Sequence, residues 1–165
     1  MNKILDNPHK YLTLLLILIW MGVIASFSAQ HGEASGSLSG TIAGHIVSLE
    51  ERIFGQAFTE QDRLDRIDFW QFPVRKGAHV SVYLVLGVLL AIHMLFYSIT
   101  EKKRFVIALL IIVLYACFDE LHQYFVPGRV ACIKDVGLDT VGGLMGIGLV
   151  RIISSTPRRT CARFS

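Results

Sequence analysis

The sequence predicts an all-α membrane protein, a polytopic bundle of four transmembrane helices. Of its 165 residues, 53% are hydrophobic and only 18% are charged, and the mean hydropathy is +0.52. Soluble domains carry about 25% charged residues, so this composition excludes an ordinary soluble domain. Four apolar runs are long enough to cross the roughly 30 Å hydrocarbon core of a bilayer, at about residues 11–29, 76–97, 104–125 and 135–153. We therefore expect one membrane domain over residues 1–165.

The first apolar run predicts an uncleaved membrane anchor. Lys3 and Lys10 precede it and small residues end it, a pattern that is also typical of a secretory signal peptide. The candidate cleavage site follows Ala29, and Phe27 would then occupy a position that requires a small side chain. The sequence therefore favours a first transmembrane helix over a signal peptide.

Residues 30–75 are too polar to span, and we expect them to form an amphipathic helical segment outside the cytoplasm. Between Ile42 and Phe58, apolar residues recur at spacings of three and four. This periodicity predicts a helix that lies on the membrane surface. Phe69, Trp70 and Phe72, at the end of the segment, are typical of an interfacial aromatic anchor.

Two of the later helices carry their distinctive residues at intervals of four. Arg75, His79 and Tyr83 follow one another at this interval, so they share one face of the second predicted span. In the last span, Gly142 and Gly146 form a surface of small residues that lets another helix backbone approach closely. We predict that this glycine pair packs against another helix of the bundle.

Basic residues predict the orientation. Lys102, Lys103 and Arg104 form one short turn, and residues 154–165 form a basic tail. The positive-inside rule places both regions, and therefore both termini, in the cytoplasm. In that orientation the outer ends of the helices carry a set of polar residues: Ser28, Gln30, Arg75, Lys76, His79, Tyr83, Asp119, Glu120, His122, Gln123, Arg129, Asp135 and Asp139.

Ionisable groups inside a bilayer are costly, so these side chains are expected to face a shared pocket that opens to the outer leaflet. Arg75, Lys76 and Arg129 are the candidates for holding an anionic headgroup, since arginine binds phosphate with two parallel hydrogen bonds. The catalytic candidates are His79 or His122 as general acid or base, poised by Asp119 or Glu120. The remaining candidates for substrate binding are Tyr83, Gln123, Asp135, Asp139, Ser28 and Gln30.

These residues predict an enzyme that acts on an anionic envelope lipid or a lipid-linked phosphate. The alternative is a protein that binds or shields a lipid-bearing ligand, or an envelope partner, without chemistry. A buried polar network that only fixes helix packing would also use them. A transporter is disfavoured because the inner half of the bundle offers almost no polar path, and the residues leave the oligomeric state open.

No cofactor is expected. A divalent metal on Asp119, Glu120, His122 and Asp135 is an alternative, although their spacing matches no established site. Cys117, Cys132 and Cys161 lack the spacing of a ligand set and are expected to stay unpaired. No basic patch interleaved with aromatic residues indicates nucleic acid, so the expected partners are the lipid bilayer and a lipid ligand.

Three motifs in this sequence resemble the VanZ-like family of bacterial membrane proteins. They are RKGAHVSVYLVLG at residues 75–87, DELHQYFVPGR followed by KDVGLDTVGGLMG from residue 119 to residue 146, and FSAQ at residues 27–30. The resemblance covers nearly the whole chain from the first span onward. It implies a small polytopic protein of the bacterial cell membrane, in a family named for a member that confers resistance to the glycopeptide teicoplanin.

The family's motif positions in this sequence are Arg75, Lys76, His79, Tyr83, Asp119, Glu120, His122, Gln123, Pro127, Gly128, Arg129, Asp135 and Gly142. The chain departs from the family at three positions. Val82 stands where relatives often have an acid, Cys132 where they have a serine, and Asp139 where they have an asparagine. If the acid at the position of Val82 takes part in the family's chemistry, this chain lacks the chemistry that the acid supplies.

Overall fold

The computed structural model describes residues 7–30, 32–129 and 132–155, with only the backbone for residues 32–35. The described residues form five helices and no strand: α1 (Pro8–Ser28), α2 (Gly32–Phe54), α3 (Glu60–Met94), α4 (Glu101–Tyr124) and α5 (Ile133–Ser155). Four of them, α1, α3, α4 and α5, are long and apolar enough to cross a membrane. The predicted all-α fold with four candidate spans is confirmed.

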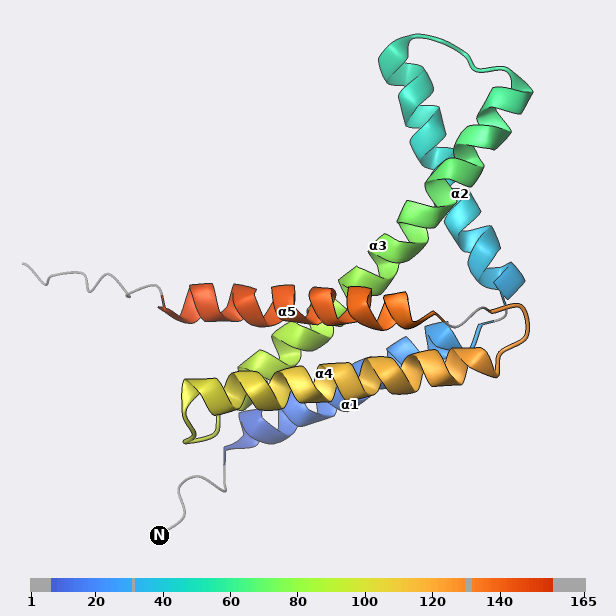
Figure 1. Cartoon of the computed structure of the whole chain (residues 1–165). Coiled ribbons are helices and arrows are strands. Elements are labelled where there is room, and N and C mark those ends of the chain that lie inside the picture. Colours follow the sequence, from blue (N-terminus) through green and yellow to red (C-terminus); the bar gives the residue numbers. More distant parts are fainter. Residues whose placement is uncertain (1–6, 31, 130–131, 156–165) are drawn as a thin grey trace, which may run out of the picture.

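Helix α3 is the central element of the bundle. It crosses α1, α4 and α5 and packs on all four other helices, most extensively on α5 (Figure 1). Tyr83, Leu86 and Leu90 of α3 form the core together with Ile112 and Ala116 of α4. The outward faces remain apolar, and in α1 only Ile17, Ile24 and Ser28 are buried. Such a surface is expected of helices that face lipid.

Helix α3 begins much earlier than the second predicted span, at Glu60 instead of residue 76. The Thr59 side chain accepts a hydrogen bond from the backbone N–H of Asp62, 3.2 Å away, and therefore caps the helix. Glu60 and Asp62 add negative charge to the first turn, where the helix dipole favours it. Pro73 lies inside α3 without ending it. The resulting 35 residues extend roughly 52 Å, more than a bilayer core requires.

The described part of residues 30–75, from residue 32 onward, forms a helical hairpin rather than a single surface helix. Helix α2 packs against the first part of α3, and the hairpin extends away from the bundle (Figure 1). The amphipathic helix expected over residues 42–58 begins ten residues earlier, at Gly32, and ends at Phe54. It ends there because Gly55 adopts a positive φ of 64°, which favours glycine and terminates helices.

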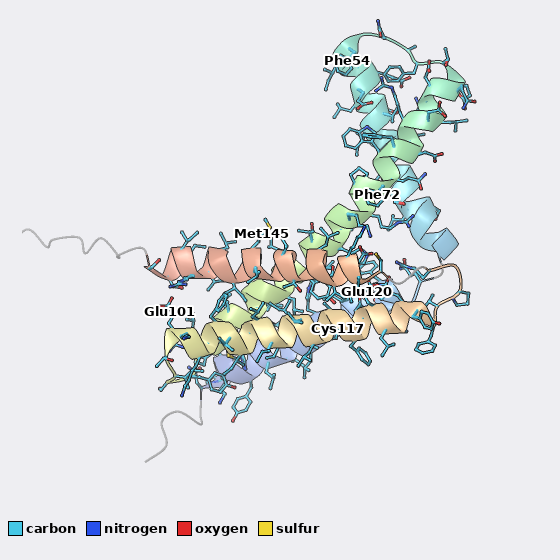
Figure 2. The ribbon with its side chains drawn as sticks, viewed as in Figure 1. Phe54, Phe72, Glu101, Cys117, Glu120 and Met145 are labelled. Carbon is cyan, nitrogen blue, oxygen red and sulfur yellow. The ribbon has the colours of Figure 1, made fainter. Side chains whose placement is uncertain are left out.

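The hairpin is held by ion pairs, and Ala43 and Val47 of α2 are fully buried. Arg63 Nη1 lies 2.7 Å from Glu51 Oε2, and Arg66 Nη1 lies 3.0 Å from Glu50 Oε2. Trp70 Nε1 also donates to Glu50 Oε1 at 3.0 Å. The larger apolar side chains of α2 remain exposed: Leu38, Ile42, Leu49, Ile53 and Phe54. The hairpin therefore has exposed apolar side chains, among them Phe54 near its turn (Figure 2).

Candidate functional site

Direct contact between the α3 and α5 backbones sets the geometry of the site. A Cβ added at Gly142 would overlap the Val80 carbonyl, and one at Gly146 would overlap the Leu84 carbonyl. The predicted packing of this glycine pair against another helix is therefore confirmed. Because the backbones touch, the register of the two helices is fixed. It places His79 of α3 opposite Asp139 of α5.

His79, Glu120 and Asp139 form a cluster of titratable groups from three helices. One ligand atom of each residue lies within 4.8 Å of the other two. His79 Nδ1 is 3.3 Å from Asp139 Oδ1, and the Asp139 side chain is fully buried. Among the described residues, both Asp139 carboxylate oxygens and Glu120 Oε1 are buried without a hydrogen-bond partner. The cluster therefore combines two acids with one imidazole and leaves polar atoms unsatisfied.

The next carboxylate, Asp119, has a hydrogen-bond partner. Its Oδ2 accepts a hydrogen bond from Gln123 Nε2 at 3.1 Å, one turn further along α4. The same amide nitrogen lies 3.3 Å from Ser28 Oγ at the end of α1. Asp119, Gln123 and Ser28 are all buried. This network fixes the end of α1 against α4.

Lys76 is paired with Asp135, the first acidic residue of α5. Lys76 Nζ donates to Asp135 Oδ1, and the ammonium also lies 5.5 Å from the centre of the Phe72 ring. Asp135 is buried, so the pair neutralises one carboxylate at the start of α5. Lys76 therefore has an intramolecular partner instead of an open position for a headgroup.

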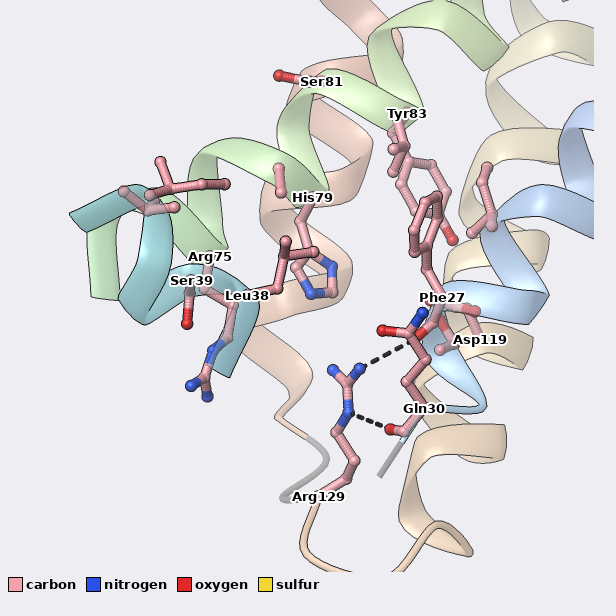
Figure 3. Close-up of a pocket in the computed structure, with 16 residues that line it drawn as sticks. Phe27, Gln30, Leu38, Ser39, Arg75, His79, Ser81, Tyr83, Asp119 and Arg129 are labelled. Carbon is pink, nitrogen blue, oxygen red and sulfur yellow. Dashed lines mark hydrogen bonds between the residues drawn. The ribbon is translucent and has the colours of Figure 1, made fainter. Parts of the chain in front are cut away.

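Arg129 lies beyond the end of α4 and folds back toward α1. Gly128, with a φ of 76°, makes the turn possible. Arg129 Nε donates to the Gln30 carbonyl at 3.1 Å and Nη2 donates to the Phe27 carbonyl at 2.9 Å (Figure 3). Burial, and then the nearby charge of Arg75, lower the pKa of the Arg129 guanidinium from its ordinary value. Arginine nevertheless keeps its charge in proteins, so Arg129 presents a fixed cation.

A cavity of about 350 Å³ lies between these elements. Its polar lining includes Arg75, His79, Tyr83, Asp119 and Arg129, contributed by α3, α4 and the loop that follows α4. In Figure 3 the guanidinium groups of Arg75 and Arg129 flank the space next to His79. Most other walls are apolar, and they include Ile24, Phe27, Leu38, Ile42, Val74 and Val82. The arrangement provides a space with cationic and ionisable groups beside surfaces suited to hydrocarbon.

The structure divides the candidate residues into three groups. The first lines the cavity: Ser28, Gln30, Arg75, His79, Tyr83, Asp119 and Arg129. The second contacts this group without lining the cavity: Glu120, Gln123 and Asp139. The third comprises Lys76 and Asp135, which pair with each other, and the half-buried His122, which belongs neither to the cavity nor to the carboxylate cluster.

Sequence reasoning missed the contribution of α2 to the cavity. Leu38, Ser39 and Ile42 form part of the wall because α2 returns over the end of the bundle (Figure 3). Only Ile42 belonged to the apolar periodicity that predicted a surface helix, and periodicity alone does not show which neighbour a helix covers. Tyr83, a predicted binding residue, has a fully buried hydroxyl without a hydrogen-bond partner among the described residues.

Comparison with known protein families gives a match over most of the chain. The VanZ/LLP1 family matches residues 13–154, a range that extends from α1 to the end of α5 and includes every candidate site residue. No curated protein and no solved structure matches the chain. The match and the four apolar helices fit a multi-pass membrane protein. The chain belongs to the VanZ/LLP1 family.

Proposed function

We propose that this VanZ-like protein is an envelope enzyme that binds an anionic lipid in the cavity and hydrolyses its phosphate ester. The observation that carries the proposal is the composition of the cavity: two arginines and an ionisable wall beside an apolar lining. An anionic headgroup with a hydrocarbon chain needs both surfaces at once. A soluble anion would not need the apolar walls.

Arg75 and Arg129 bind the headgroup in this proposal. Arg129 uses Nε and Nη2 for the carbonyls of Gln30 and Phe27, and these bonds hold the guanidinium in place. Arg75 is exposed at the cavity and makes no ion pair in the described part of the chain. A phosphate between the two guanidinium groups would accept charge-assisted hydrogen bonds, which are stronger than neutral ones.

The reaction supported by the site is hydrolysis. Water adds to phosphorus, the bond between phosphorus and the lipid oxygen breaks, and the lipid alcohol and inorganic phosphate leave. A group in the cavity wall accepts a proton from water, and the alkoxide leaving group takes up a proton. His79 and Asp119 are the wall residues suited to these transfers. The outer leaflet is the proposed location because the basic turn at residues 102–104 and the tail favour the cytoplasm at the opposite end of the bundle.

The test uses the purified protein in nanodiscs with a long-chain prenyl phosphate. Native mass spectrometry measures binding, and release of inorganic phosphate measures turnover. Arg75→Gln and Arg129→Gln should each weaken binding by at least about tenfold, since each removes a charge-assisted contact worth roughly 1.5–3 kcal/mol. Arg151→Gln, at the opposite end of α5, is the matched control and should bind as the wild type does.

The His79→Gln variant distinguishes an enzyme from a protein that only binds or shields the lipid. It should bind the prenyl phosphate but release no phosphate, whereas a binding or shielding protein would release none even as wild type. Equal binding of a neutral diacylglycerol with similar chain volume would contradict the headgroup role of the arginines. Teicoplanin susceptibility of cells that express wild-type or His79→Gln protein tests the resistance phenotype that the resemblance implies. The proposal expects only the wild type to lower susceptibility.

A further inference from the structure

We infer that His79, Glu120 and Asp139 form a binding site for one divalent first-row transition cation, at the edge of the cavity. The inference does not require that the protein hydrolyses a lipid. It rests on the geometry of three side chains from α3, α4 and α5 and on their unsatisfied oxygens. Figure 2 places Glu120 between α4 and α5, near the end of the bundle from which the hairpin extends.

The charge balance of this region calls for a further cation. Asp119, Glu120, Asp135 and Asp139 are all buried, with between 0% and 7% of each residue exposed. Lys76 pairs with Asp135, and the charged nitrogens of Arg129 are directed to backbone carbonyls. Asp119 has its amide partner Gln123. Within 4.8 Å of one another, the ligand atoms of Glu120, Asp139 and His79 combine two acids with one imidazole, so the cluster itself has more acidic than basic groups.

The unsatisfied oxygens belong to the same three-residue cluster. Glu120 Oε2 accepts a hydrogen bond from Cys132 N at 2.8 Å, which orients the carboxylate and leaves Oε1 without a partner among the described residues. Neither Asp139 oxygen has a hydrogen bond, and His79 Nδ1 is the neighbouring nitrogen at 3.3 Å. Removing a carboxylate from water without compensation costs several kcal/mol. A cation bound by all three side chains would compensate both acids.

The donor set selects the kind of cation. One imidazole nitrogen and two carboxylate oxygens suit Mn²⁺, Fe²⁺, Co²⁺ or Zn²⁺. Ca²⁺ takes six to eight oxygen ligands, and Mg²⁺ is usually bound through carboxylates and substrate phosphates. Three protein ligands also leave coordination positions for water or for a ligand oxygen, as in catalytic zinc sites. His79 lines the cavity, so an open position would be accessible from it.

The position of this cation would link it to the proposed substrate. A phosphate held by Arg75 and Arg129 would lie beside His79, within the same cavity. The cation would then polarise a phosphoryl oxygen. With His79 bound to the cation, Asp119 instead of His79 would be the wall residue that accepts a proton. This extension rests on the proposed function, whereas binding of the cation does not.

Metal binding by chelator-treated protein tests the inference directly. Titration of the wild type with Mn²⁺, followed by the loss of the free-ion electron paramagnetic resonance signal, should show one tightly bound ion per chain. Asp139→Asn and Glu120→Gln should each weaken binding at least about 100-fold, since loss of a ligand should exceed the 10–100-fold cost of losing an outer-shell partner. His122→Gln, two residues from Glu120 on α4, is the matched control and should bind Mn²⁺ as the wild type does.

A second measurement needs no variant and therefore does not depend on whether the substituted proteins fold. Pulsed electron paramagnetic resonance of the Mn²⁺-loaded wild type should show coupling to one imidazole nitrogen. Absence of bound Mn²⁺, absence of that coupling, or undiminished binding by folded Asp139→Asn would each overturn the inference. Failure here would leave the prenyl phosphate binding test intact, because that test depends on Arg75 and Arg129.

Discussion

His79 and His93 lie on the same helix, near opposite ends of the bundle, and their surroundings differ. Both ring nitrogens of His93 have partners: Nδ1 lies 2.8 Å from Thr13 Oγ1 and Nε2 lies 3.2 Å from the Tyr97 hydroxyl. His79 Nδ1 has Asp139 as its ion-pair partner among the described residues, and the ring borders the cavity. A histidine with both nitrogens occupied stabilises packing, whereas one that borders a cavity retains the capacity to bind or exchange protons.

The same contrast extends to the other buried polar atoms. Among the described residues, those buried without a hydrogen bond are the Tyr83 hydroxyl, Glu120 Oε1, both Asp139 carboxylate oxygens and Arg104 Nε. All except the Arg104 atom belong to the end of the bundle that carries His79. Unsatisfied polar groups reduce stability, so their concentration at one end indicates a role other than packing.

The largest expected loss of stability comes from disrupting the backbone contact between α3 and α5. Gly146→Leu should strongly lower the melting temperature in detergent, because its side chain would collide with the Leu84 carbonyl and the α3 backbone. Overpacking of this kind costs about 1–3 kcal/mol or more. Gly148→Leu on the same helix is the control, since a Cβ there meets nothing within 4 Å. Equal melting temperatures for the two variants would contradict the α3–α5 register.

His93→Ala should destabilise the protein without altering the site. It removes the hydrogen bonds that half-buried Thr13 and Tyr97 make to the imidazole, and a typical hydrogen bond contributes about 0.5–1.5 kcal/mol. The measurement is chemical unfolding in detergent together with prenyl phosphate binding. If binding falls while stability stays unchanged, the distinction between the two histidines fails.

Asp139→Asn should raise the stability of the chelator-treated protein, whereas the two preceding substitutions lower it. It removes a buried charge whose oxygens lack a hydrogen bond, and asparagine keeps a side-chain oxygen beside His79 Nδ1, so the free energy of unfolding should rise by about 1 kcal/mol. Asp135→Asn, four residues earlier on α5, is the comparison. It should lower stability because Lys76 would lose its partner. A loss of stability in Asp139→Asn would show that His79 and Asp139 form a satisfied structural pair.

The smallest effect is expected in the hairpin. Arg63 and Glu51 form an ion pair at 2.7 Å, with about a third and a fifth of their side chains exposed. Solvent screening limits such pairs to about 0.2–1 kcal/mol, which a double-mutant cycle with Arg63→Gln and Glu51→Gln should recover. A coupling above this range would show that the hairpin is more rigid than its surface position implies.

Much of the fold follows from the sequence because hydropathy and small-residue spacing carry the relevant physics. The four apolar runs predicted the spans, and Gly142 and Gly146 predicted the close helix contact that the structure contains. The start of α3 was not predictable in the same way. Pro73 and the charged residues before it favour a boundary, and contacts with α2 carry the helix past them.

The site was predictable as a set of residues but not as a set of pairs. Spacing along one helix places Asp119 near Gln123, and the structure contains that hydrogen bond. Contacts between helices depend on their rotation and register, which single-helix periodicity does not define. For this reason the sequence did not indicate that Lys76 pairs with Asp135, or that Asp139 and Glu120 converge on His79 while His122 lies outside.

The central claim is that the end of the bundle carrying His79 and the cavity faces outward. The hairpin leaves the bundle at that end (Figure 1), so the location of its turn decides the question. Cysteines introduced at Gln56 and at Lys102, with the three native cysteines replaced by serine, would be labelled on intact cells with a membrane-impermeant maleimide. We predict labelling of Gln56→Cys in intact cells and of Lys102→Cys only after permeabilisation. The reverse pattern would place the cavity at the cytoplasmic side and contradict the account.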